Sequence, residues 1–80
     1  MKEYKYRYTI CDFSDVEIYK KQCIALEKNI PNIKIIFKLD AVDGTDISEY
    51  EVQGEKIIIK NSDIVDAVFI ESEIDLEQFF

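Results

Sequence analysis

The sequence predicts an α/β domain with a mixed sheet, and three observations support this. Residues 4–10 alternate tyrosine or isoleucine with polar side chains, as a half-buried strand does. Apolar residues then recur at spacings of three and four between positions 16 and 30, which is typical of an amphipathic helix. A second alternating run follows at 33–39. Strand, helix and strand form a βαβ unit, so we expect two parallel neighbouring strands joined by a right-handed crossover.

The helix should begin at a capping box. Ser14 is followed three residues later by Glu17, so the serine hydroxyl can accept from the glutamate amide while the carboxylate reaches back. Phe13 and Ile18 fit a hydrophobic staple across the same turn. Pro31 cannot continue a helix, so the helix should end shortly before it, near residue 29.

The rest of the chain divides into shorter elements. An Asp-Gly pair marks residues 40–46 as a loop. Residues 47–52 fit either a short helical turn or a strand, and we expect the helical turn. Two β-branched runs, at 56–60 and 64–70, flank a polar turn at 61–63 and predict a hairpin.

A Ser-x-x-Asp cap at Ser72 predicts a final helix that reaches Phe80. The 80 residues then form a single domain, 1–80, of two or three layers with the order β-α-β-(short α)-β-β-α. No apolar run approaches the about 18 residues of a membrane span, and the first residues lack the apolar core of a signal peptide. We therefore expect a cytoplasmic protein with reduced cysteines and no membrane partner.

Charge is distributed unevenly along the chain. Residues 1–38 carry eight Lys or Arg and five Asp or Glu, whereas residues 39–80 carry two Lys and twelve Asp or Glu. The acidic half would repel nucleic acid phosphates and attract a basic protein surface, although acidity can also serve solubility alone. No Lys or Arg occurs between residues 39 and 55. The best candidates for a binding surface are the five carboxylates of this stretch: Asp40, Asp43, Asp46, Glu49 and Glu51.

The composition argues against metal and cofactor chemistry. Histidine is absent, which removes the usual general base and the commonest zinc ligand, so we expect no metal and no cofactor. The aspartates of the 40–46 loop could suggest calcium. An EF-hand register with Gly44 at its sixth position would put Leu39 first and Tyr50 twelfth, where carboxylates are needed. A weak site for a hard cation remains an alternative.

The element order resembles the thioredoxin-like fold, and in particular small glutaredoxin-like domains. Cys11-Asp12-Phe13-Ser14 is similar to the Cys-x-x-Ser monothiol motif of that family, and residues 48–80 look like its short helix, hairpin and final helix. The family's cis-proline and second active-site cysteine are missing. The resemblance implies monothiol–disulfide exchange through Cys11, for instance with glutathione, as one possible activity.

The residues around Cys11 favour a structural cysteine over a catalytic one. Asp12, Asp15 and Glu17 disfavour a thiolate, although a helix N-terminus would favour it. The last eight residues also resemble the peptide by which proteins dock on DNA sliding clamps, but Phe79 and Phe80 are needed for a small core. We therefore expect a non-catalytic, inhibitory or regulatory module that binds a basic protein, with monothiol exchange as the alternative. The sequence does not specify an oligomeric state.

Overall fold

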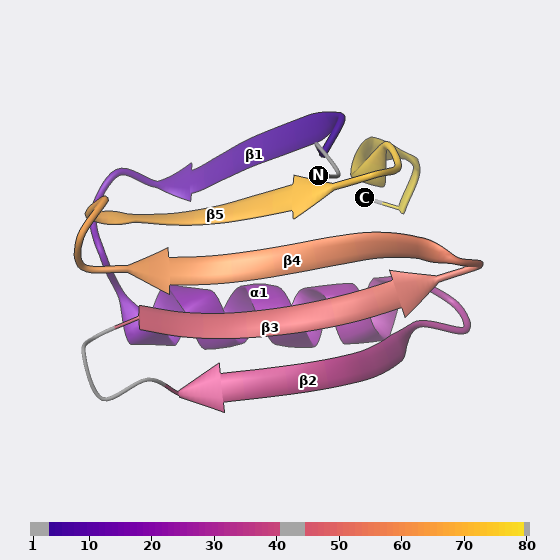
Figure 1. The fold of residues 1–80 in the computed structure, drawn as a ribbon, viewed down its shortest axis with the longest axis horizontal. Coiled ribbons are helices and arrows are strands. Elements are labelled where there is room, and N and C mark those ends of the chain that lie inside the picture. Colours follow the sequence, from indigo (N-terminus) through magenta and orange to yellow (C-terminus); the bar gives the residue numbers. More distant parts are fainter. Residues whose placement is uncertain (1–3, 41–44, 80) are drawn as a thin grey trace.

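The computed structural model describes residues 4–40 and 45–79, including every side chain in these ranges except that of Asp40. Within this part of the chain, five strands form one antiparallel sheet in the order β1-β5-β4-β3-β2, and one α-helix covers one of its faces (Figure 1). The elements are β1 (Tyr6–Cys11), α1 (Val16–Asn29), β2 (Lys34–Asp40), β3 (Thr45–Val52), β4 (Glu55–Ser62), β5 (Ala67–Ser72) and a 3-10 helix, η1 (Leu76–Phe79).

The prediction of an α/β, thioredoxin-like or glutaredoxin-like fold is wrong, because the described part is mostly β and its sheet is antiparallel throughout. β1 and β2 do run in the same direction, but they form opposite edges of the sheet, with three strands between them. Each of β3, β4 and β5 pairs with the strand before it. Short connections favour such antiparallel neighbours, so β1 finds its partner in β5, the last strand.

Residues 47–52 belong to β3 and do not form a helical turn. Their even-numbered side chains are buried and their odd-numbered ones half-buried, which is the period of two of a strand. A two-residue turn follows, in which Gln53 has φ 51° and Gly54 has φ 83°. Two positive φ angles make the primed turn that matches the twist of a hairpin. The predicted final helix is also wrong, since only the single turn η1 forms, and Ser72 belongs to β5.

The predicted helix is confirmed at its end and corrected at its start. α1 ends at Asn29, two residues before Pro31. Its N-cap is Asp15, whose carboxylate accepts from the amides of Glu17 at 2.9 Å and Ile18 at 3.2 Å. A carboxylate satisfies these first-turn donors and also complements the helix dipole. The capping box predicted at Ser14 is therefore wrong, since the Ser14 hydroxyl binds elsewhere.

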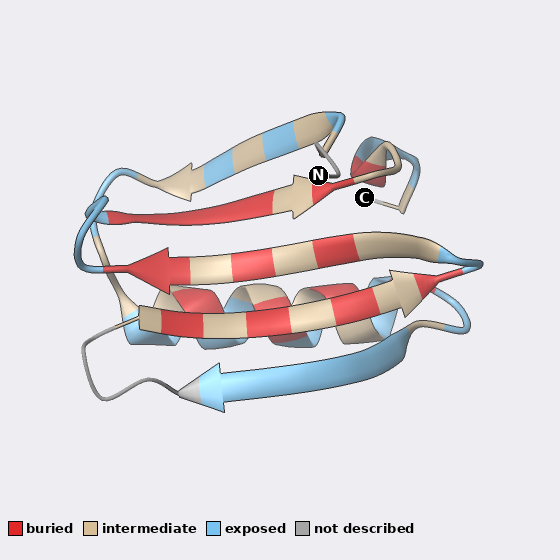
Figure 2. Cartoon of the chain, viewed as in Figure 1, coloured by how far each residue is buried: buried red, intermediate tan, exposed pale blue. Residues whose placement is uncertain are grey.

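The core lies between α1 and one face of the sheet (Figure 2). Tyr19, Cys23, Leu26 and Ile30 of the predicted helical stripe are all buried, whereas Val16 is 45% exposed. They pack on alternate residues of the three central strands. The strand side chains of this core are Tyr50, Val52, Ile57, Ile59, Val68 and Ile70, and Leu76 of η1 joins them.

The opposite face of the sheet carries no helix and alternates charged and apolar side chains. Phe69, on this face of β5, is only 5% exposed, because the guanidinium of Arg7 lies 4.5 Å and the ammonium of Lys60 5.9 Å from its ring centre. Long cationic side chains thus cover the ring where no helix does. Among the described residues, no helix is long and apolar enough to cross a membrane.

Candidate functional site

The structure does not gather the five predicted carboxylates into one surface. Glu49 and Glu51 are half-buried on the open face of the sheet, opposite Phe37 and Lys34 of β2. Asp46 faces the helix side and is buried, where it accepts from the amide of Asn61 at 3.0 Å. The backbone of Asp40 ends β2, but its side chain and all of Asp43 lie outside the described residues. A cation site in the 40–46 loop also falls largely outside them.

Two other carboxylates, both in the β4–β5 turn, lie against the segment before α1, at the end of the sheet where β1 and β4 finish. The amide of Ser14 donates to Asp66 Oδ1 at 2.9 Å, and its hydroxyl donates to Asp63 Oδ1 at 2.6 Å. These bonds join segment 12–17 to the β4–β5 turn at 63–66. We call these two segments together the acidic end.

The buried side-chain amide of Asn61 connects the acidic end to the sheet. Asn61, 3% exposed in β4, accepts from the Asp15 amide at 3.0 Å and donates to Asp46 at 3.0 Å. It therefore fixes the start of α1 against two strands at once. Of the predicted site residues, Asp46 thus contributes to this end as a buried support and not as part of its surface.

The acidic end also carries large apolar side chains that face solvent. Ile64 is 84% and Val65 58% exposed in the turn, and Phe13 is 53% exposed beside Ser14. With Val16, they make four of the nine large apolar residues that are exposed among the described residues. The only charged side chains in segments 11–19 and 61–67 are carboxylates. The chain therefore presents apolar groups with acidic neighbours from two adjoining segments.

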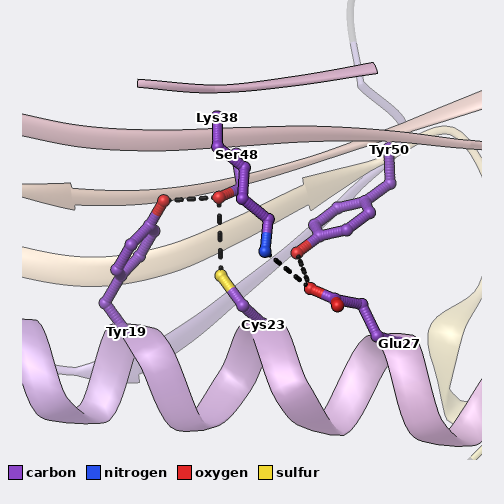
Figure 3. Close-up of polar contacts among 6 residues, drawn as sticks. All are labelled: Tyr19, Cys23, Glu27, Lys38, Ser48 and Tyr50. Carbon is purple, nitrogen blue, oxygen red and sulfur yellow. Dashed lines mark hydrogen bonds and ion pairs between the residues drawn. The ribbon is translucent and has the colours of Figure 1, made fainter. Parts of the chain in front are cut away.

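A second cluster of polar groups lies between α1 and the strands β3 and β2 (Figure 3). The hydroxyls of Tyr19 and Ser48 are hydrogen-bonded, and the Cys23 thiol donates to Ser48 Oγ at 3.5 Å. Glu27 Oε2 accepts from Tyr50 OH at 2.7 Å and pairs with Lys38 Nζ at 2.9 Å. The cluster borders an open groove of about 270 Å³ between α1 and the sheet.

The protonation of this cluster follows from its burial. Burial raises the pKa of Tyr19 well above its usual range, and burial together with the Glu27 carboxylate does the same for Tyr50. The Tyr50 hydroxyl, with a smaller contribution from Lys38, lowers the pKa of Glu27. Both phenols therefore stay protonated, and that of Tyr50 donates to Glu27. No buried side-chain nitrogen or oxygen in the described residues lacks a partner, so this network reads as a satisfied structural element.

Cys11 ends β1 and does not sit at the helix N-terminus. It is half-buried, lies opposite Val68 across a bulge and packs against the core. The first free amides of α1, which could stabilise a thiolate, already donate to Asp15. Monothiol exchange through Cys11 thus stays a prediction, with no contact in the structure that favours it.

Comparison with known proteins identified no relative: no family model, no curated protein and no solved structure matches the chain. Across residues 4–40 and 45–79, no three Cys, Asp or Glu side chains lie close enough to hold a metal ion.

Proposed function

We propose that the chain is a non-catalytic protein-binding module, inhibitory or regulatory in role, that uses its acidic end to bind a basic surface of another protein. The observation that carries this proposal is the pair of hydrogen bonds from Ser14 to Asp63 and Asp66. These bonds hold the β4–β5 turn, in which the strongly exposed Ile64 and Val65 lie between the two carboxylates.

Protein interfaces likewise combine exposed apolar side chains with charged neighbours. Their affinity comes mainly from a few apolar side chains at the centre, while charges at the rim set the association rate and reject wrong partners. At the acidic end, Ile64 and Val65 would supply the centre, and Asp12, Glu17 and Asp66 part of the rim. The net charge of −7 adds long-range attraction for a basic partner.

Partner capture from the native host, with matched baits, tests this proposal. The first bait is the intact chain, and the second carries Ile64→Ser and Val65→Ser. Both side chains are more than half exposed, so the fold should tolerate the change. The third bait, Ile24→Ser, is the control: Ile24 is 63% exposed but lies in α1, beside the groove.

The expected partner has a basic surface and binds the intact and control baits. It is lost from the Ile64→Ser/Val65→Ser bait, and its affinity for the intact chain falls as salt rises, because salt screens exposed charges. A partner that all three baits hold equally would overturn the proposal. So would an affinity for the intact chain that salt does not change.

The cytoplasm is the proposed compartment. In support of this, Cys11 and Cys23 are free thiols, as is usual for proteins in a reducing environment. Fractionation of the host cells with a tagged chain checks it, and the tag should appear in the cytoplasmic fraction.

A further inference from the structure

One helix is too narrow to cover a five-stranded sheet. The outer strands of such a sheet lie about 19 Å apart, whereas a helix with its side chains is about 10–12 Å wide. α1 accordingly packs against β3 and β4. At the β1 edge η1 gives additional cover, since the Leu76 amide donates to Tyr8 OH at 3.0 Å. At the β2 edge no described element takes this place (Figure 1).

β2 is correspondingly exposed. Ile35, Ile36, Phe37 and Leu39 are 44–52% exposed, and in the described residues β2 pairs with β3 alone. A strand directs its peptide groups alternately to its two sides, so about half of those in β2 point away from β3. Free peptide groups beside apolar side chains are what an added strand recognises.

The bulge in β2 distributes its apolar side chains over both faces. The register shifts between Ile35 and Phe37, which places Ile35 opposite Tyr50 on the helix side and Phe37 opposite Glu49 on the open face. The alternating run at 33–39 predicts one apolar face that includes both Ile35 and Phe37, and the bulge shows that this prediction is wrong. An added strand would meet apolar groups on both of its own faces.

On the helix side of this edge, two lysines and one glutamate line the groove. The lysines are Lys20 and Lys38, whereas Lys34 lies on the open face opposite Glu51. Glu27, which also lines the groove, is already bound to Lys38 and Tyr50. Lys20, to which no carboxylate is bonded among the described residues, therefore offers positive charge to whatever binds in the groove.

From these observations we infer that β2 is a strand-addition site for an extended segment of another protein, with apolar side chains alternating with Asp or Glu. The segment pairs with the outer peptide groups of β2. Its apolar side chains point to the open face and pack on Phe37 and Leu39, and its carboxylates point to the helix side, near Lys20 and Lys38.

A second copy of this chain fits the edge less well. The β2 strand of a second copy carries Lys34 and Lys38 and, apart from Asp40 at its end, no carboxylate that could lie near Lys20.

A displayed peptide library tests the inference. Its members alternate one of Ile, Val, Leu or Phe with one of Asp, Glu, Lys or Arg, and the bait is the full chain. We expect acidic members to be selected and Lys20→Glu to weaken their binding by about three- to tenfold. Lys21→Glu is the matched control, because Lys21 is exposed in α1 beside Lys20 but does not line the groove, and it should change binding less than twofold.

Backbone methylation of the best selected peptide tests for strand pairing. N-methyl groups along one edge of the peptide should abolish binding, whereas those along the other edge should leave it intact, and exchange of the outer β2 amides should slow in the complex. A library without binders, the selection of basic members, or tolerance of methyl groups on both edges would overturn the inference. A dimer that is lost in Phe37→Lys would also overturn it, in favour of a second copy. These surfaces differ from the acidic end, so Ile64→Ser should leave peptide binding unchanged.

Discussion

The buried side chain of Asn61 connects β4 with β3 and with the N-cap of α1, so its removal should lower the free energy of unfolding considerably. In Asn61→Ala, the Asp15 amide loses its acceptor and the buried Asp46 carboxylate loses its donor. A neutral hydrogen bond contributes about 0.5–1.5 kcal/mol and one to a charged group about 1.5–3 kcal/mol. The free energy of unfolding should therefore fall by about 2–4 kcal/mol, a large part of the about 4–12 kcal/mol of a domain of this size.

An exchange of the two side chains provides the control. Position 61 lies directly opposite Asp46 in the β3–β4 ladder, so Asn61→Asp alone sets a second carboxylate against the first. This variant should lower the free energy of unfolding by more than Asn61→Ala does. Adding Asp46→Asn restores one amide and one carboxylate. The new amide at position 46 can donate to the carboxylate at 61, which still accepts from the Asp15 amide. The double variant should therefore recover most of the loss.

The pH dependence of Asn61→Asp has a definite sign. Two facing carboxylates raise the folded-state pKa of one of them above its unfolded value, so this group favours folding below its unfolded pKa. The stabilising effect is lost as the pH rises through the folded pKa. The deficit of Asn61→Asp relative to the native chain should therefore shrink in acid.

Urea unfolding at unchanged m-value measures these differences. A cost of less than about 0.5 kcal/mol for Asn61→Ala would refute the bridging role, because that is the usual effect of an exposed substitution. Failure of the double variant to recover would refute the pairing of Asn61 with Asp46.

Three further predictions follow from single contacts. Glu27→Gln should lower the free energy of unfolding near neutral pH but change it little in acid. The pKa of Glu27 is lowered in the folded state, so its carboxylate stabilises the fold above the unfolded pKa, and this effect is lost as the pH falls through the folded pKa. Urea unfolding at several pH values measures the difference. Gly54→Ala should lower the free energy of unfolding by about 1 kcal/mol in the same assay, because φ is 83° although no atom lies near. Cys11 should react with iodoacetamide no faster than a cysteine in an unstructured peptide, and a faster reaction at neutral pH would favour monothiol exchange.

Local signals predicted α1 and β1 well, whereas the pairing of the strands depends on residues distant in sequence. The helical stripe and Pro31 determine where α1 lies and ends. The βαβ inference failed because a helix between two strands does not require them to be neighbours. Here β2 pairs with β3, and β5 takes the place beside β1. The pair Gln53-Gly54, between the alternating residues 47–52 and the β-branched run at 56–60, was the local signal for the β3–β4 hairpin.

The acidic end could not be read from the sequence for a related reason. Residues 64–70 are an apolar run, and such a run predicts a strand. β5 nevertheless begins only at Ala67, because it lies between β4, which pairs with it as far as Ser62, and β1, which ends at Cys11. Ile64 and Val65 lie beyond the ends of both neighbours, and a positive φ of 55° at Asp66 turns the chain back into the sheet. The lengths of its partners therefore decide which part of an apolar run is core and which part remains exposed as a candidate binding surface.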